Sequence, residues 1–284
     1  MTGTRPVLTA EEVWRTYDAV ETRLTAPVSE RMLDLARLEP GMRVLDIASG
    51  RGEPAVRAAQ RVGRAGLVLG VELSEPLLGM AQERTAREGL SNVEFRSGNA
   101  ELLEDIPTAY FHAATCRWGL NAMASPIAAL ERVRRALAPG GPLVAALWAE
   151  PDRVPYFTLP RRLLEHYRPL PRFDLEAPGT FRYSDPERIV RDFSRAGFTV
   201  EHFEEMTVTV MEAEDSADLI AWVRALGLTK LLNEIPEDAQ KAWEDELTGE
   251  LKRLGTGGVF RLGGVTRLVV ARPKPLESGS LEIP

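Results

Sequence analysis

The chain has 284 residues, of which 44% are hydrophobic, enough for one sizeable core. It carries 35 basic and 42 acidic side chains, a net charge of −7. A protein that grips a phosphate backbone normally presents a basic surface, so this charge argues against a nucleic-acid substrate. Composition therefore favours one large globular domain.

Cysteine usage and hydropathy exclude further classes. Cys116 is the single cysteine, so no intramolecular disulfide can form, and no Cys/His cluster predicts a metal site. The N-terminal stretch "MTGTRPVLTAEEVW" lacks the apolar run of a signal peptide, and no later stretch is long and apolar enough to cross a membrane. We therefore expect a cytoplasmic protein with no metal and no membrane partner.

Two helices are expected at the N-terminus. Thr9 and Glu12 have capping-box spacing, and apolar residues then recur at helical intervals as far as Leu24. A second helical stretch covers residues 29–40 and stops at Pro40, which is followed by a glycine.

From residue 42 onward, short apolar runs alternate with amphipathic helices. The apolar runs predict five strands, at residues 42–48, 66–73, 92–98, 109–119 and 142–148. The helices between them are expected at residues 55–62, 74–89 and 125–138. Strands rich in Val, Leu and Ile that alternate with helices predict an α/β fold, with a parallel sheet covered on both faces.

The second half of the chain is less regular. Residues 149–183 are rich in proline and aromatic residues and predict an irregular, partly helical insertion. Beyond them we expect a helix at 184–198, a strand at 199–211, helices at 216–227 and 236–255, and a last strand at 257–273.

The turn after the first predicted strand is where an open parallel sheet binds ligands. Residues 44–55, "VLDIASGRGEPA", contain Gly50 and Gly52 in a G-x-G-x-x-A pattern, which lets a ligand approach the backbone. Glu72 ends the second strand and can accept hydrogen bonds from both ribose hydroxyls. These features serve NAD and S-adenosylmethionine alike, so the glycines leave the ligand open.

Two carboxylates in and before this turn separate the two ligands. Asp46 comes four residues before Gly50, and Glu53 lies inside the turn. At roughly 4–6 Å from a pyrophosphate, such charges would oppose binding by about a few kcal/mol where screening is poor. S-adenosylmethionine has no phosphate, and Asp46 would attract its ammonium and sulfonium groups, directly or through a water. The turn therefore favours a cationic ligand.

These residues resemble motif I of class I S-adenosylmethionine-dependent methyltransferases. The stretches 70–81, 92–103, 111–123 and 129–148 resemble the family's later motifs in the same order, in wording closest to the ubiquinone/menaquinone-biosynthesis methyltransferases and their small-molecule relatives. The resemblance covers residues 10–150 well. It implies a Rossmann-like, doubly wound, seven-stranded, mainly parallel sheet with an antiparallel last strand, S-adenosylmethionine as cofactor and S-adenosylhomocysteine as product.

The resemblance also implies a domain layout. One methyltransferase domain spans residues 1–275 and is followed by a flexible tail. Its parts are an N-terminal helical cap, a cofactor-binding core, two cap insertions over the acceptor site and the tail, at residues 1–40, 41–148, 149–183, 212–257 and 276–284.

Cofactor contacts follow from the same resemblance. Glu72 would bind the ribose, Asn99 the adenine amino group, and Ala100 the ring through its backbone N–H. Tyr17 resembles a lid tyrosine, although core packing explains it equally well. The full set of implied cofactor residues is Tyr17, Asp46, Ala48, Ser49, Gly50, Gly52, Glu72, Leu73, Asn99, Ala100 and Cys116.

Three residues depart from the family pattern. Ala48 stands where a glycine is common, and Asn99 stands where Asp is usual, although its amide oxygen can still accept a hydrogen bond. His112 replaces an Asp early in the fourth strand, and we expect it at the end of that strand away from the ligand.

The acceptor is expected beyond the end of the fourth strand. Arg117 and Trp118 end that strand, where either could shape the acceptor site or serve as scaffold. His166 in the first insertion is a candidate general base, with a surface histidine as the alternative. The candidate catalytic residues are His166, Arg117 and Trp118, and the candidate substrate residues are Trp118, Trp148, Tyr156, Phe157 and His166.

The predicted activity is in-line methyl transfer to a carbon or oxygen of an apolar small molecule, such as a secondary metabolite or quinone-like precursor. The Asn/Asp-Pro-Pro-aromatic signature of nitrogen methylation is missing from the sequence, which favours carbon or oxygen. A cofactor-binding relative that performs a non-methylating reaction or acts as a binding partner is the main alternative, and an NAD-dependent oxidoreductase is a weaker one. The oligomeric state is left open, with a homodimer as one option.

Overall fold

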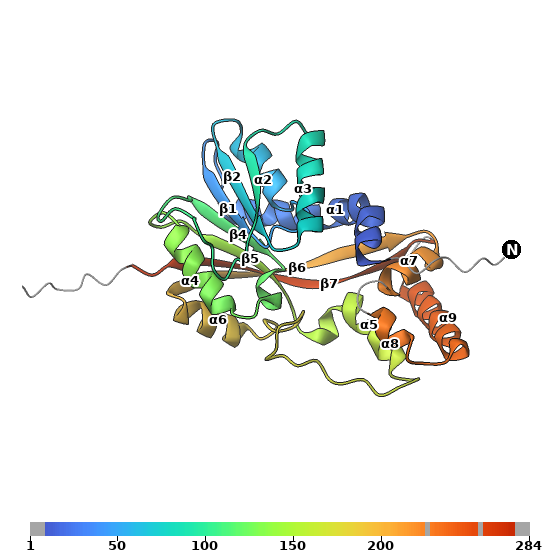
Figure 1. Ribbon diagram of the computed structural model, residues 1–284. Helices are drawn as coiled ribbons and strands as arrows, with labels where there is room; N and C mark the ends of the chain where they lie inside the picture. The colour runs from blue at the N-terminus through green and yellow to red at the C-terminus, as the bar shows by residue number, and fades with distance from the viewer. Residues whose placement is uncertain (1–8, 225–227, 255–257, 276–284) are drawn as a thin grey trace, which may run out of the picture.

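A seven-stranded sheet forms the centre of the molecule in the computed structural model, which describes residues 9–224, 228–254 and 258–275 (Figure 1). The strand order is β3-β2-β1-β4-β5-β7-β6. The strands are β1 (Arg43–Ile47), β2 (Leu67–Glu72), β3 (Val93–Ser97), β4 (Ala113–Arg117), β5 (Leu143–Trp148), β6 (Phe198–Ala213) and β7 (Phe260–Pro273).

Strands β1 to β5 are mutually parallel, and β7 lies antiparallel between β5 and β6. The predicted doubly wound sheet with an antiparallel last strand is therefore confirmed. Strand order reverses between β1 and β4, so a crevice opens beyond their carboxyl ends, where such sheets bind ligands.

Helices cover both faces of the sheet, with α1, α2 and α3 on one side and α4 and α6 on the other (Figure 1). Alternate residues of a strand point to opposite faces, so Val44 of β1 joins the first apolar cluster and Leu45 joins the second. The helices of the described residues are α1 (Ala10–Leu35), α2 (Ala55–Val62), α3 (Glu75–Arg87), α4 (Pro126–Ala136), α5 (Pro155–Leu164), α6 (Pro186–Arg195), α7 (Ser216–Val223), α8 (Thr229–Leu232) and α9 (Glu237–Leu254).

The prediction of two N-terminal helices is wrong, because α1 is one helix of 26 residues that runs through Pro27. The capping box of Thr9 and Glu12 is present at its start. A proline inside a helix removes one backbone hydrogen bond. Here Val28 and Met32 continue the buried face beyond the proline, and both are fully buried, which offsets that loss.

The fourth strand is also shorter than predicted. It begins at Ala113 rather than at residue 109. Ala109 has a left-handed φ of 52°, and Phe111 makes only an isolated bridge to Leu137, so the backbone before Ala113 is not extended in the sheet.

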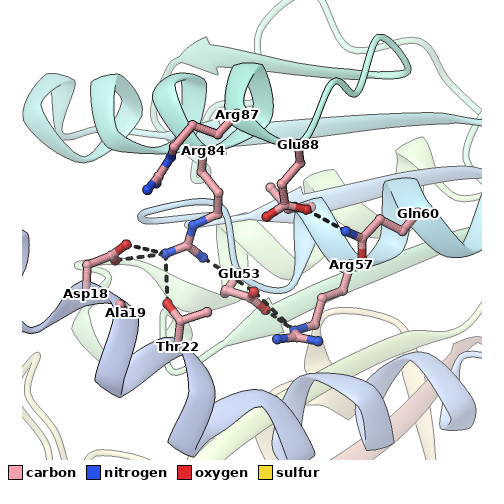
Figure 2. A pocket seen from close by; sticks show the side chains of 10 residues that line it. Asp18, Ala19, Thr22, Glu53, Arg57, Gln60, Arg84, Arg87 and Glu88 are labelled. Carbon is pink, nitrogen blue, oxygen red and sulfur yellow. Dashed lines mark hydrogen bonds and ion pairs between the residues drawn. The ribbon is translucent and has the colours of Figure 1, made fainter.

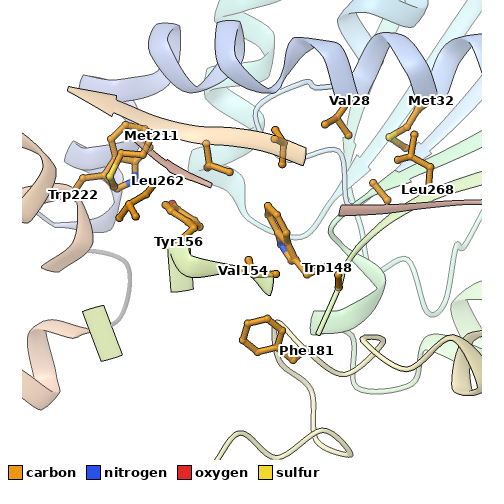
Figure 3. Close-up of a cluster of buried hydrophobic side chains, with 14 of the residues drawn as sticks. Val28, Met32, Trp148, Val154, Tyr156, Phe181, Met211, Trp222, Leu262 and Leu268 are labelled. Atoms are coloured by element: carbon orange, nitrogen blue, oxygen red, sulfur yellow. The ribbon is translucent and has the colours of Figure 1, made fainter. Parts of the chain in front are cut away.

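The two insertions pack together against the extended β6–β7 pair. Helix α5 contacts α9 and β7, and α7 contacts β6 and α9. Figure 3 shows Trp148, Tyr156 and Phe181 among the apolar side chains that fill this region. The predicted tail at 276–284 lies outside the described residues, as do 1–8 of the N-terminal cap and parts of the second insertion, 225–227 and 255–257.

None of the helices in the described part of the chain combines the length and apolar character needed to cross a bilayer.

The β6–β7 pair yields a stability prediction. A Cβ at Gly263 would lie 1.9 Å from the backbone oxygen of Val208, so Gly263→Ala forces the two strands apart. We expect a loss of about 1–3 kcal/mol in the free energy of unfolding, measured by urea denaturation. The control is Gly249→Ala on α9, where no atom lies within 4 Å and the helix should gain about 0.5–1 kcal/mol. Equal stability of the two variants would contradict this packing.

Candidate active site

The turn that follows β1 takes its shape from three residues in the left-handed region. The φ angles of Ala48, Gly50 and Gly52 are 52°, 54° and 91°. A Cβ at Gly50 would meet no atom within 4 Å, so this glycine faces open space. A Cβ at Gly52 would lie 3.1–3.3 Å from side chains of α2, α3 and β3. Gly52 therefore allows α2, α3 and β3 to pack closely, and its contact with a ligand stays a prediction.

Glu72 ties the end of β2 to this turn. Its Oε2 accepts the Gly50 N–H at 3.0 Å, and its Oε1 accepts the N–H groups of Leu73 and Ser74, both at 2.9 Å. A carboxylate has about four acceptor positions, so Glu72 retains capacity for a ribose hydroxyl while it holds the turn.

Asp46 lies beneath the turn and is fully buried. The Thr115 hydroxyl donates to its Oδ1 at 2.7 Å, whereas its Oδ2 and the Ser49 Oγ are buried without a hydrogen-bond partner. Burial raises the pKa of Asp46 to about 7, although the bond from Thr115 opposes the rise. Buried polar atoms are normally satisfied, so these two orphaned oxygens fit a cationic ligand bound at the turn.

The surroundings of Glu53 show that its charge was wrongly taken to repel a pyrophosphate. Both of its oxygens accept from the Arg57 Nε at 3.1 Å, and the Arg84 Nη1 lies 3.4 Å from its Oε1 (Figure 2). Its charge is thus compensated within the protein and does not argue against a pyrophosphate. The electrostatic argument for a cationic ligand rests on Asp46 and Glu72 alone.

Helix α1 covers the turn through ion pairs. The Arg84 Nη2 donates to both Asp18 oxygens at 2.8 and 2.7 Å and to the Thr22 hydroxyl at 2.8 Å (Figure 2). Arg51, inside the turn, lies 2.9 Å from Asp18 and 2.7 Å from Glu21. A charged cavity of about 290 Å³ lies between α1, α2 and α3, next to this network.

A second cavity, of about 100 Å³, lies over the turn. Its lining includes five predicted site residues, Ala48, Ser49, Gly50, Arg117 and Trp118. It also includes Glu53, the second carboxylate of the sequence argument, and three residues that the sequence did not single out, Thr22, Arg51 and Arg84. Ordinary small-molecule pockets measure roughly 300–1,000 Å³, so α1 as placed leaves room for only part of a nucleoside-sized ligand.

For the missed residues of α1, the sequence does contain a signal, which is the spacing of the polar residues in this helix. Asp18, Thr22, Thr25 and Ser29 recur at intervals of four, three and four residues, which places them on one face of α1. A polar stripe on a helix that also buries an apolar face indicates a second contact surface, and here it faces the arginines of the turn and of the strand ends.

The predicted adenine-side residues lie at the ends of β2 and β3. The Asn99 Oδ1 accepts the Glu101 N–H at 2.9 Å, so this amide closes its own loop, and its contact with the adenine stays a prediction. Leu73 is 69% exposed and Ala100 is buried. These three residues follow the carboxyl ends of β2 and β3, on the side of the sheet where the glycine turn lies.

Two other predicted cofactor residues lie in packed surroundings. Burial raises the pKa of the Cys116 thiol to about 12, so it stays protonated at neutral pH. Tyr17 stacks on Trp222 with ring centres 4.5 Å apart and donates to the backbone oxygen of Asp218 at 3.2 Å. Tyr17 therefore joins α1 to α7, as its core-packing interpretation required.

The predicted acceptor residues form a row of aromatic rings. Trp118 and Trp148 stack with centres 4.6 Å apart and planes 9° apart, and the edge of Phe157 meets Trp148 at 5.5 Å. The Trp118 Nε1 donates to the Thr266 hydroxyl at 2.9 Å. An apolar cavity, so called because most of its lining side chains are apolar, continues the row and measures about 180 Å³. It is lined by Tyr156, Phe157, Pro160, Arg161, Phe173, Thr180, Val223, Leu228 and Leu231.

His166 lies apart from this row. Its Nδ1 is 2.9 Å from Glu246 of α9, its side chain is 58% exposed, and it lines neither the turn cavity nor the apolar one. His112 lies at the amino end of β4, away from the glycine turn, as expected. There its Nδ1 accepts the N–H of Arg43, the first residue of β1, at 2.8 Å. Burial, together with the Arg43 charge, lowers the pKa of His112.

Ala48 gives a test of backbone strain. A left-handed φ costs a non-glycine residue about 1–2 kcal/mol. Ala48→Gly should therefore raise the free energy of unfolding by up to about 1 kcal/mol, measured by urea denaturation. The same substitution at Ala58, buried inside helix α2, should lower it by about 1 kcal/mol or more. A loss of stability in both variants would contradict the turn geometry.

Asp46 gives a test by pH. Its pKa is 3.8 in the unfolded reference and about 7 in the folded chain, so the folded state holds an extra proton between about pH 4 and 7. The contribution of Asp46 to the free energy of unfolding therefore falls as the pH rises through this window, and it levels off above it. Relative to wild type, Asp46→Asn should gain stability on the order of 3 kcal/mol between pH 4 and 7. Urea denaturation at both pH values checks this, and a constant difference would contradict it.

Comparisons with known proteins agree with this geometry. Residues 38–158 match the model of a methyltransferase domain. Nocamycin O-methyltransferase of Saccharothrix syringae is 26% identical over 273 residues, which covers 91% of this chain and 95% of that one. The ubiquinone/menaquinone biosynthesis C-methyltransferase UbiE of Hydrogenovibrio crunogenus is 34% identical over 113 residues, and the match spans 39% of this chain and 44% of that enzyme.

A solved structure shares the fold. The S-adenosylmethionine-dependent methyltransferase of Aquifex aeolicus superposes with a TM-score of 0.52 at 19% identity, over 69% of this chain and 92% of that one. The strand order, the glycine turn closed by Glu72 and the sequence matches together support a class I S-adenosylmethionine-dependent small-molecule methyltransferase.

Proposed function

We propose that this enzyme methylates a carbon or oxygen atom of an apolar, ring-containing small molecule. One observation carries the proposal: the row Trp118–Trp148–Phe157 runs from the glycine-turn cavity to the lining of the apolar cavity. Aromatic walls with few polar groups are typical of sites for drug-sized apolar ligands.

One end of the site would bind the cofactor and the other end the acceptor. Glu72 would hold the ribose, Leu73, Asn99 and Ala100 would border the adenine, and Asp46 would favour the positively charged methionine end from beneath the turn. S-adenosylmethionine supplies a methyl group on a good, already charged leaving group. The protein's contribution is then alignment and exclusion of water, worth up to roughly 7–11 kcal/mol in favourable cases.

Helix α1 and the stacked tryptophans are the elements suited to these tasks. Asp18 and Glu21 of α1 hold it against Arg51 of the turn, where it screens the cavity from solvent. Trp118 lines the turn cavity and stacks on the buried Trp148, which fixes the ring that a ring-shaped acceptor would meet.

The names of the relatives support the choice of acceptor atom. One is an O-methyltransferase and the other a C-methyltransferase, and both names refer to small molecules. The net charge of −7 favours such an acceptor over a nucleic acid. The single free cysteine agrees with a reducing, cytoplasmic compartment.

Calorimetry with S-adenosylhomocysteine tests the cofactor end. Glu72→Ala removes both the ribose acceptor and the bond to the Gly50 N–H, so affinity should fall about tenfold or more. Glu94→Ala on the neighbouring β3, where the carboxylate pairs with Arg96 on the surface, should leave affinity unchanged.

Two outcomes would count against the proposal. Wild-type protein that does not bind S-adenosylhomocysteine would contradict the cofactor assignment as a whole. Equal affinity in wild type and Glu72→Ala, with both variants folded by circular dichroism, would contradict only the role of Glu72.

A further inference from the structure

Arg117, the last residue of β4, carries a guanidinium without a carboxylate partner in the described ranges. Its Nη1 donates to the Thr25 hydroxyl at 2.8 Å and the Ser29 hydroxyl at 3.2 Å, both on α1. Its Cζ lies 4.8 Å from the centre of the Trp118 ring. Hydroxyl and ring contacts hold the group in place but do not neutralise its charge.

The other two arginines that line the same cavity are paired. Arg51 contacts Asp18 and Glu21, and Arg84 contacts Asp18 and Glu53. Burial lowers the pKa of Arg117, although the fields of Glu53 and Glu21 partly oppose the change. An uncompensated charge in a low-dielectric site is costly, so an anion that approaches Arg117 would be bound favourably.

A second observation concerns the general base. The chain has three histidines. His112 lies at the amino end of β4, away from the glycine turn, and His166 and His202 pair with Glu246 and Glu204 near the surface. No histidine is among the residues that line the turn cavity or the apolar cavity.

Other proton acceptors near the site are also unsuited to the task. Burial raises the pKa values of Tyr156 and Cys116, so both stay protonated at neutral pH. Asp46 is fully buried beneath the turn and does not line the cavity, and Glu53, which does line it, is paired with Arg57 and Arg84. Among the residues that the structure describes, the site thus presents a cation but no unpaired group poised to remove a proton from an alcohol or an amine.

We propose that Arg117 binds the reacting oxygen of the acceptor, and that this oxygen is already ionised at neutral pH, as in a carboxylate or an acidic enol. The inference rests on the proposed function and narrows its acceptor. Arg117 lies where the aromatic row meets the glycine turn, beside Trp118, so an oxyanion on it would have its apolar ring system along that row.

The chemistry balances without a base. The acceptor oxygen donates an electron pair to form the new O–CH₃ bond, the S–CH₃ bond breaks, and its electron pair stays on sulfur. A negative oxygen and a positive sulfonium become two neutral groups, and no proton is released. The product is a methyl ester or an enol methyl ether. An arginine fork suits such an oxyanion because it offers several N–H donors in one plane.

The anion could also come from the cofactor, whose amino-acid portion carries a carboxylate. The first experiment separates the two sources by calorimetry of wild type and Arg117→Met with S-adenosylhomocysteine and with its decarboxylated analogue, 5′-S-(3-aminopropyl)-5′-thioadenosine. We expect the substitution to change both affinities by no more than about twofold. A large loss for S-adenosylhomocysteine alone would overturn the proposal, because Arg117 would then hold the cofactor.

The second experiment probes the acceptor side in saturating S-adenosylhomocysteine. The probes are 1-naphthoate and 1-naphthamide, which share a flat apolar ring system and differ in charge. Wild type should bind the carboxylate about tenfold or more tightly than the amide, and Arg117→Met should lose that preference. Equal binding of the two probes, or no binding of naphthoate, by wild-type protein would overturn the proposal.

A control separates anion binding from a merely structural role of Arg117. Thr25→Val removes one of the hydroxyls that join Arg117 to α1 but keeps the guanidinium. This variant should keep the preference for naphthoate, whereas loss of the preference to the same degree as in Arg117→Met would show that Arg117 acts through α1. Failure of wild type to bind S-adenosylhomocysteine would contradict the proposed function itself, which distinguishes the two claims.

Discussion

The contact between Arg84 and Asp18 is the interaction on which the site depends. Arg84 of α3 is 5% exposed and donates to both oxygens of Asp18 on α1. Removing one partner of such a buried pair typically costs about 3–5 kcal/mol, because the other charge is left uncompensated. Together with Arg51, the pair holds α1 across the carboxyl ends of β1 and β4, and it thereby sets the size of the cavity over the turn.

Charge is distributed unevenly around that cavity. Asp46 and Glu72 lie at the turn and at the end of β2, and Arg117, which has no carboxylate partner in the described part of the chain, lies at the end of β4. Under the proposed roles, the acidic residues bind a cationic cofactor and the arginine binds an anionic acceptor. The reaction cancels the two ligand charges, and the products lose the electrostatic attraction that brought the reactants together.

Much of the core could be predicted from local sequence. The helix at 55–62 and the strand ending at Glu72 appear as expected, because their periodicity and end signals agree with the tertiary packing. The prediction failed at Pro27, where a buried apolar face carried the helix through a residue that usually ends one. It failed again at Glu53, whose charge is met in part by Arg84 of α3, 31 residues away in the sequence.

The sequence by itself determined the α/β order, the glycine turn and the kind of cofactor, because these depend on short motifs and on residue periodicity within single elements. Tertiary structure decided which charges remain free. Glu53 and Arg117 are both ionisable residues near the turn. Within the described ranges, Glu53 pairs with two arginines, whereas Arg117 contacts two hydroxyls and an aromatic ring. Whether a charge is compensated depends on side chains brought together from separate elements, and no local pattern contains that information.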